Sequence, residues 1–193
     1  MLKIVTAPNS VLSEPAKKVS KIGKSVLRLI EEMKQALLSA KDPEGVGLAG
    51  PQVGKSLQIF LVKPTPESSI QVFINPKINS ITKTSHLTIG SDRMMQLNES
   101  STRKSKTKLE GCLSLPNIWG DVEREPIITI SYLDEKGKTH ARKFSGLLAT
   151  IIQHEIDHLE GILFPKRVLE QKGKLYKSHK DEKNEDVFEE IEL

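Results

Sequence analysis

The chain has 193 residues, of which 37% are hydrophobic and 28% are charged, and this length is enough to bury the core of one globular domain. Its aromatic content of only 4% predicts an aliphatic core, and its formal net charge is +4. The sequence contains neither a run of transmembrane length nor a signal-peptide pattern, so we expect a cytoplasmic protein with no membrane segment. An organellar protein whose transit peptide has been removed is the second interpretation.

Residues 25–40 are predicted to form an amphipathic helix. Apolar side chains recur there at spacings of three and four, which places them on one face: Val26, Leu29, Ile30, Met33, Ala36 and Leu37. The turn-forming residues 42–45 end this helix. Two short apolar runs, residues 57–62 and 70–74, are typical of strands.

Residues 45–54 are rich in glycine and contain Gln52 near their end. A phosphate-binding loop is a weak interpretation, because no lysine stands at the required position. Two interpretations stay open at this point. One is a plain glycine turn. The other is a segment that runs close to a ligand while Gln52 donates its amide N–H to an oxyanion.

Residues 80–108 are rich in Ser, Thr and Lys and have few apolar residues. Six basic and two acidic residues give this segment a charge of +4, equal to the formal net charge of the whole chain. A flexible, solvated insert is the simpler interpretation. The alternative is a contact with ribosomal RNA, because phosphates attract clustered Lys and Arg. No pattern indicates specific DNA binding.

Cys112 is the only cysteine, which excludes an intramolecular disulfide framework and fits a reducing compartment. It follows Gly111 and lies between the polar residues Glu110 and Ser114. A free cysteine is often a small buried hydrophobe. The preceding glycine and the polar neighbours favour a thiolate that binds metal.

Residues 127–133 and 138–144 flank the turn 134–137, which predicts a β-hairpin. Ser145 then stands where the N-cap of a helix is expected, and Gly161 stands where a glycine ends one. The order of elements predicts an α+β fold, in which antiparallel or mixed strands pack around this central helix.

His154, Glu155 and His158 form an H-E-x-x-H pattern inside the predicted helix. Histidines four positions apart lie one turn apart on the same face, so both imidazoles can bind one divalent metal ion. Glu155 lies at the edge of that site, where it can take a proton from metal-bound water. The alternative is a pair of core histidines with satisfied hydrogen bonds, which explains neither the spacing nor the glutamate between them.

A catalytic metal site of this kind needs a third protein ligand. In one class of H-E-x-x-H proteases this is a histidine six residues after the second, a position that Phe164 occupies here. In another class it is a glutamate of a later helix, but the glutamates from Glu170 onward lie in a charged tail. The remaining candidate gives a site made of Cys112, His154 and His158, with water in the fourth position.

Residues 166–193 are a tail of mixed charge, for which we predict a charged helix. The chain is therefore divided into a catalytic domain over residues 1–165, which includes the basic insert, and a C-terminal tail over residues 166–193. We find no internal repeat.

Three segments together resemble the three signature motifs of the peptide deformylases, in the same order. They are G-V-G-L-A-G-P-Q at residues 45–52, E-G-C-L-S at residues 110–114 and Q-H-E-I-D-H-L-E-G at residues 153–161. The resemblance covers residues 1–165, including an N-terminal segment similar to that of the family. One departure is Gly50, where the family usually has alanine.

The resemblance implies a role for each motif residue. Glu155 would act as general acid and base, and the developing oxyanion would be held by the side-chain amide of Gln52 and the backbone N–H of Leu113. The metal ligands would be Cys112, His154 and His158. The substrate peptide would lie as an added strand along Gly45, Val46 and Gly47.

The family also holds the substrate's methionine side chain in an apolar pocket beside the catalytic helix. By motif position, this pocket would include Thr150 and Ile151, although Thr150 is more polar than the usual residue. Trp119 is either a contact at the pocket rim or a core tryptophan.

The resemblance implies a metal-dependent hydrolase that removes the formyl group from the N-terminal formyl-methionine of nascent polypeptides and releases formate. The implied metal is Fe(II), and zinc, nickel or cobalt can occupy such a site. Two alternatives are an H-E-x-x-H metallopeptidase and a non-catalytic ribosome-binding module with a structural metal. The ribosome would be reached through the basic insert or the C-terminal tail.

Overall fold

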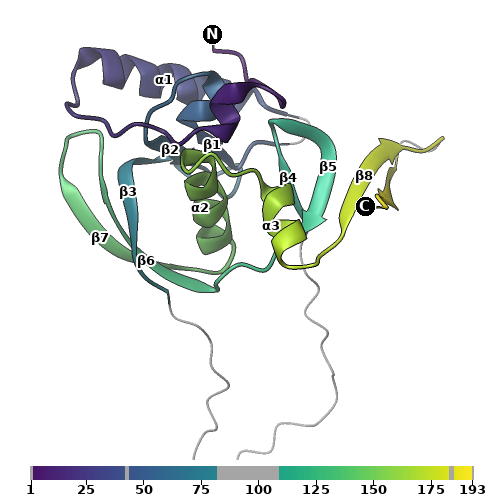
Figure 1. Ribbon diagram of the computed structural model, residues 1–193. Coiled ribbons are helices and arrows are strands. Elements are labelled where there is room, and N and C mark those ends of the chain that lie inside the picture. The colour runs from purple at the N-terminus through teal and green to yellow at the C-terminus, as the bar shows by residue number, and fades with distance from the viewer. Residues whose placement is uncertain (1, 42–43, 82–108, 183–184, 193) are drawn as a thin grey trace, which may run out of the picture.

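The computed structural model describes residues 2–41, 44–81, 109–182 and 185–192 (Figure 1). In chain order the helices and strands are η1 (Ser10–Ser13), α1 (Lys24–Ser39), β1 (Gly47–Ala49), η2 (Gly50–Val53), β2 (Ile59–Val62), β3 (Gln71–Ile81), β4 (Leu109–Cys112), β5 (Leu115–Asp121), β6 (Ile127–Leu133), β7 (Thr139–Ser145), α2 (Gly146–Leu159), α3 (Phe164–Glu170), β8 (Leu175–Lys180) and β9 (Asp186–Glu190). No helix in these ranges is long and apolar enough to cross a membrane.

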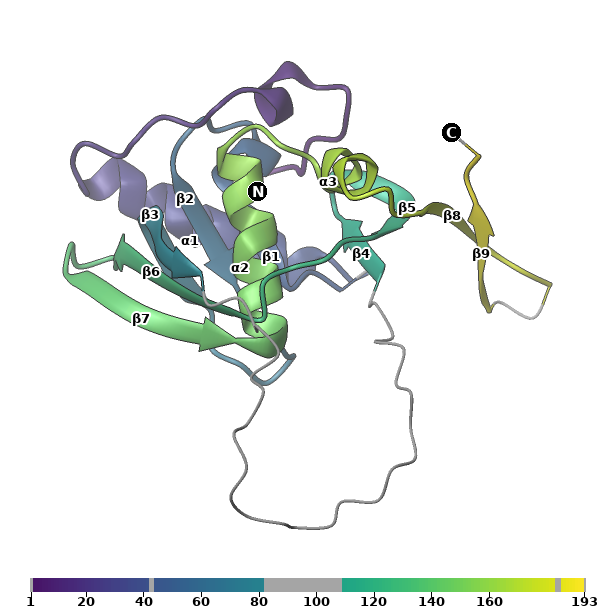
Figure 2. The ribbon, with the colours of Figure 1, turned by 60° about the horizontal axis from the view of Figure 1, so that its bottom comes forward.

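The strands form two antiparallel sheets. One has five strands in the order β1-β2-β3-β6-β7, and the other has four in the order β4-β5-β8-β9. The helix α2 lies between the two sheets (Figures 1 and 2). The predicted α+β class, with strands packed around a central helix, is confirmed, as is the predicted hairpin, which is β6–β7.

The five-stranded sheet is covered by α1 on one face and by α2 on the other. Side chains of β2 alternate between the two: Ile59 and Leu61 join the cluster that contains the apolar face of α1, and Phe60 and Val62 join the cluster that contains α2. This explains why all of β2 is buried. The apolar face predicted for α1 is buried as expected.

The expectation of an aliphatic core is wrong beside α2. Phe60 stacks on Phe73 at 4.6 Å between ring centroids, and Tyr132 and Phe144 lie around Phe73 at 4.5 and 5.8 Å. Aromatic residues are few in the chain, but β2, β3, β6 and β7 bring four of them together.

The helix α2 has the predicted ends, with one difference. Ser145 is the N-cap residue, but its side chain makes no capping hydrogen bond. Gly161 follows the helix with a φ of 72°. A Cβ at Gly161 would lie 2.8 Å from the backbone of Ser13 and Glu14, so glycine is required for the N-terminal segment to pack against this end of α2.

The charged helix predicted for residues 166–193 is present only as the last part of α3, which ends at Glu170. After α3, residues from Leu175 onward form the hairpin β8–β9, and β8 pairs with β5. Phe164, Val168 and Leu175 are buried in one cluster with Cys112. Strand pairing with β5, which no local spacing in the tail reveals, determines this conformation. The division of the chain after residue 165 stays a prediction.

Two further differences concern the segments before the cysteine. The strand predicted over residues 70–74 continues to Ile81, so β3 takes in the first two residues of the predicted insert. Residues 82–108, which carry its charge, lie outside the described residues, as do residues 42 and 43 of the predicted turn. The flexible insert stays a prediction.

Candidate metal centre

Cys112, His154 and His158 meet in the interior, although they come from two elements far apart in the sequence. One ligand atom of each residue lies within 4.8 Å of those of the other two. The Cys112 Sγ atom is 3.2 Å from His158 Nε2. Cys112 ends β4, and both histidines lie on α2. One sulfur and two imidazole nitrogens are a donor set that suits zinc or iron.

The position of Cys112 follows from the pairing of β4 with β5. The register shifts between Gly111 and Cys112, and such an irregularity changes the direction of a side chain. The sulfur accepts hydrogen bonds from the backbone N–H of Ser114 and from Gln52 Nε2, both at 3.4 Å. These two donors hold the sulfur in place beside α2.

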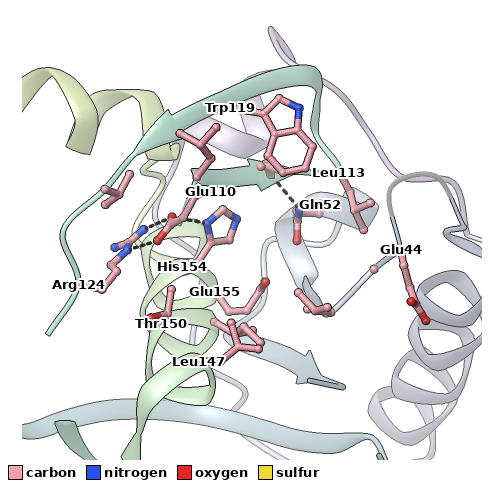
Figure 3. A pocket seen from close by; sticks show the side chains of 18 of the residues that line it. Glu44, Gln52, Glu110, Leu113, Trp119, Arg124, Leu147, Thr150, His154 and Glu155 are labelled. Carbon is pink, nitrogen blue, oxygen red and sulfur yellow. Dashed lines mark hydrogen bonds and ion pairs between the residues drawn. The ribbon is translucent and has the colours of Figure 1, made fainter. Parts of the chain in front are cut away.

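Gln52 is fully buried in η2, directly after the edge strand β1. Its Oε1 atom accepts a hydrogen bond from the Ala49 N–H at 2.8 Å, which defines the orientation of the amide. Its Nε2 group therefore faces Cys112 Sγ and Ser114 Oγ, each at 3.4 Å. Figure 3 shows the Gln52 side chain in the pocket. The oxyanion interpretation requires an N–H donor directed toward the candidate metal centre, and the Gln52 amide is such a donor. A plain glycine turn requires no such donor.

Glu155 brings a carboxylate into the same buried space, with only 3% of the residue exposed. Its Oε2 atom has no hydrogen-bond partner among the described residues. Burial raises the pKa of Glu155 to about 7, because the charged form loses its hydration; the nearby Glu110 acts in the same direction, and His154 and Arg124 oppose it. A carboxyl group with this pKa can both take and return a proton near neutral pH.

Glu110 links His154, one of the three candidate metal ligands, to a buried arginine. His154 Nδ1 lies 3.1 Å from Glu110 Oε2, and Arg124 donates to both carboxylate oxygens at 2.8 and 2.9 Å. Burial by itself would raise the pKa of Glu110, but the hydrogen bonds from Arg124 and His154 lower it to about 2. The carboxylate thus orients the ring so that Nε2 is left for a metal.

The sequence predicted none of this network, which continues to Asp157 and Arg167. Arg124 donates to Asp157 Oδ2 at 2.6 Å, and Arg167 donates to Asp157 Oδ1 at 2.7 Å. The sequence does contain a signal for buried ion pairs. Glu110 and Asp157 are acidic residues inside two motifs whose neighbouring residues face the core, and buried carboxylates need cationic partners. Which arginines supply them is decided only by the fold.

Two observations bear on the ligand set. Phe164, which occupies the ligand position of one protease class, is buried and stacks on His154 with 6.2 Å between ring centroids. His158 Nδ1 is buried without a hydrogen-bond partner among the described residues. Burial lowers the pKa of His158 well below its ordinary value, which keeps the ring neutral, as a metal ligand must be.

A pocket of about 680 Å³ opens onto these groups and is lined by Gln52, Cys112, His154 and Glu155. All the predicted substrate-binding residues also line it: Gly45, Val46, Gly47, Thr150 and Ile151. Leu113 and Trp119 lie on its wall as well (Figure 3). The strand β1 is an edge strand of the five-stranded sheet, so one side of it is open to a further strand.

Comparison with known proteins gives the same result in sequence and in structure. The family model of polypeptide deformylases matches residues 1–174. Peptide deformylase 1 of Bacillus anthracis is 36% identical over 168 residues, which cover 87% of this chain and 92% of that protein.

Two solved structures have the same fold. One is a peptide deformylase from Synechococcus elongatus in complex with actinonin, with 37% identity and a TM-score of 0.68 over 86% of this chain and 78% of that one. The other is a class I type b peptide deformylase from Acinetobacter baumannii with Met-Ala-Ser bound, with 30% identity and a TM-score of 0.68 over 86% of this chain and 98% of that one. The chain belongs to the peptide deformylase family.

Proposed function

We propose that this protein removes the formyl group from the N-terminal formyl-methionine of nascent polypeptides by hydrolysis and releases formate. Membership of the deformylase family supports this activity. The single observation that carries it is the convergence of the donor atoms of Cys112, His154 and His158 beside a pocket that the buried carboxylate of Glu155 and the amide of Gln52 also line.

Cys112, His154 and His158 would hold one divalent metal ion. Their buried donor atoms and the neutral ring of His158 fit such an ion. When bound, it would lower the pKa of a coordinated water and polarise the formyl carbonyl group. We propose Fe(II) as the physiological metal, with zinc, nickel or cobalt as substitutes. Elemental analysis of protein purified without oxygen identifies it, and the Fe(II) form is expected to lose activity in air.

Glu155 would accept a proton from the attacking water and deliver it to the departing amine. Its pKa of about 7 in the metal-free protein supports both transfers, as does an Oε2 atom that has no hydrogen-bond partner in the described part of the chain. The Nε2 group of Gln52, oriented by Ala49, and the backbone N–H of Leu113 would stabilise the negative charge that develops on the carbonyl oxygen.

The substrate would bind along the edge strand. We propose that the peptide backbone pairs with Gly45, Val46 and Gly47, and that Thr150 and Ile151 contact the methionine side chain. Val46 and Leu147 are exposed apolar residues that line the pocket, which supports binding of an apolar side chain there. The structure of the Acinetobacter baumannii relative with Met-Ala-Ser bound supports the binding of such a peptide here.

Release of formate from formyl-Met-Ala-Ser tests the activity. Glu155→Ala is expected to keep the metal, since no ligand is removed, and to lower formate release by about 10² to 10⁴ fold. Unchanged turnover would remove Glu155 from the mechanism. Cleavage of the unformylated peptide, with no formate released from the formylated one, would indicate the metallopeptidase, and neither reaction would indicate a structural metal.

We propose a cytoplasmic location and a contact with the ribosome, where formylated chains emerge. A reduced Cys112 supports the cytoplasmic location, and the +4 charge of residues 80–108 supports the contact with the ribosome. Deletion of residues 91–106 is expected to weaken ribosome association measured by co-sedimentation at low salt. If salt-dependent association of the deletion variant equals that of the full chain, the insert is not the contact.

A further inference from the structure

Trp119 forms part of the pocket wall and lies against Gly111. The two residues are paired across β4 and β5. A Cβ at Gly111 would be only 2.8 Å from the indole ring, so glycine is what allows the ring to lie on the strand. Both residues line the pocket that Cys112 and His154, two of the three proposed metal ligands, also line.

The C-terminal hairpin β8–β9 also contacts the Trp119 indole, through Ser178 and Phe188. Trp119 Nε1 donates a hydrogen bond to Ser178 Oγ at 2.9 Å. The Phe188 ring meets the indole nearly at a right angle, at 81° and with 5.7 Å between centroids. Ser178 and Phe188 are direct cross-strand partners in β8 and β9, so the hairpin presents them together.

These contacts belong to residues that have no other assigned role. Phe188 is 42% exposed, which is unusual for an aromatic residue unless its ring is used at a surface. Ser178, in contrast, is buried, and its hydroxyl partner is the indole. Together with Gly111, the hairpin restricts an indole that is otherwise partly open to the pocket.

We propose that Ser178 and Phe188 are positioning residues that hold Trp119 as the wall against which the peptide segment after formyl-methionine lies. This rests on the proposed function. In Figure 3, Trp119 and Thr150 lie on opposite sides of His154 and Glu155. The side of Thr150 is the one proposed for the methionine side chain, which leaves the Trp119 side for the residues that follow. An indole face packs well against apolar side chains and peptide groups.

The single tryptophan of the chain makes the proposal directly testable, because fluorescence excited at wavelengths that the two tyrosines do not absorb reports on Trp119 alone. The test variants are Ser178→Ala and Phe188→Ala in the metal-loaded enzyme. The control is Lys177→Ala, an exposed neighbour of Ser178 on the opposite face of β8. Ser178→Thr and Phe188→Tyr keep the hydroxyl and the ring and are the rescue variants.

Loss of one hydrogen bond or one aromatic contact is expected to raise the KM for formyl-Met-Ala-Ser about threefold to tenfold, while kcat stays within about twofold. The KM for formyl-methionine amide, which lacks the following residues, is expected to change less than about twofold. Indole emission is expected to shift to the red and to be quenched more by acrylamide. Lys177→Ala and the two rescue variants are expected to match the wild type.

Three results would overturn the proposal. The first is unchanged emission in both alanine variants, which would mean that the hairpin does not hold the indole. The second is a red shift with an unchanged KM, which would mean that the indole does not contact the peptide. The third is an equal rise in KM for both substrates.

The proposal can also be tested apart from the proposed activity. Met-Ala-Ser added to the wild-type protein is expected to change Trp119 fluorescence, and Phe188→Ala is expected to weaken that binding about threefold or more. If no formate is released but this titration behaves as expected, the proposed function fails and the positioning role stands. Because Phe188 is largely at the surface, its alanine variant is expected to fold, which thermal unfolding checks.

Discussion

Glu155 illustrates how a single residue can be useful at the site and costly for the fold. Its carboxylate is buried, and Oε2 has no hydrogen-bond partner among the described residues. The resulting rise of its pKa from 4.5 to about 7 means that the metal-free native state holds this proton more tightly than the unfolded state does. Stability therefore falls as the pH rises through this interval.

The first prediction follows from this linkage. Metal-free Glu155→Gln, which cannot ionise, is expected to be more stable than the metal-free wild type above pH 7, by up to about 3 kcal/mol. The difference should diminish as the pH falls and disappear well below pH 4.5, where Glu155 is protonated in both states. Urea unfolding in the presence of a chelator at several pH values measures it. Equal stabilities at pH 8 would contradict the cost assigned to Glu155.

Arg124 gives a second prediction at this scale. Its side chain is 7% exposed and bridges the carboxylates of Glu110 and Asp157, so its removal leaves the buried carboxylate of Glu110 without its arginine partner and leaves Asp157 with Arg167 alone. Arg124→Met is expected to lower the free energy of unfolding by about 3 to 5 kcal/mol. Combination with Glu110→Gln should recover part of this loss, because the buried carboxylate that has lost its arginine partner is then replaced by a neutral amide.

Glu110 itself has the opposite pH dependence from Glu155. Its pKa is lowered to about 2, so its contribution to stability is present above pH 4.5 and is lost as the pH falls toward 2. Denaturant unfolding of Glu110→Gln and of the double variant at pH 7 would identify the coupling with Arg124. If the double variant is no more stable than Arg124→Met, the two side chains are not coupled.

At the scale of elements, the approach of β1 to α2 depends on the absence of a side chain at Gly47. A Cβ built there would overlap the carboxylate of Glu155. The edge strand that would bind the peptide is thus packed directly against the helix that carries the proposed base. A Cβ at Gly111 would likewise lie too close to the indole ring of Trp119.

The third prediction tests this packing. Gly47→Ala is expected to displace the Glu155 carboxylate and to lower formate release by about 10 to 10² fold, because small displacements at a reacting centre have large effects on rate. Metal content should stay near that of the wild type. Gly23→Ala is the matched control, since nothing lies within 4 Å of a Cβ at that glycine. Equal loss of activity in both variants would show that the effect is not local.

At the scale of the whole molecule, the proposed metal site joins two parts of the fold. Cys112 lies on the four-stranded sheet, and His154 and His158 lie on the helix that covers the five-stranded sheet. A bound ion would therefore add a link between two elements that the Glu110–His154 contact and the Arg124 bridge already join. An ion that binds the native state alone stabilises that state.

The fourth prediction concerns metal removal. At a free metal concentration of about 100 times Kd, the metal-loaded protein gains about 2.7 kcal/mol, which corresponds to a rise in Tm of about 5 to 10 °C for a chain of this size. Cys112→Ala is expected to abolish the difference between chelated and metal-loaded samples in calorimetry. A metal-dependent shift of unchanged size in this variant would exclude the thiol as a ligand.

Much of the fold and of the candidate site follows from local spacing in the sequence. The apolar face of α1 and the shared face of His154 and His158 follow from a period of 3.6 residues, which is set within a single helix. Turn and cap residues predicted the hairpin β6–β7 and the ends of α2. Residue chemistry and the order of the motifs placed Cys112 and Gln52 among the predicted site residues. In the structure, Cys112 lies beside both histidines, and Gln52 contacts Cys112.

The remaining features were decided by tertiary structure. Three of these features join residues that lie far apart in the sequence. They are the ion pairs of Glu110 and Asp157, the aromatic cluster around Phe73, and the contacts of the β8–β9 hairpin with Trp119. Such contacts leave no periodic pattern in either segment, because the energy of a strand pair or a buried ion pair belongs to both partners together. The sequence by itself determined which chemistry the chain carries; the fold determined how the side chains that perform it are oriented and supported.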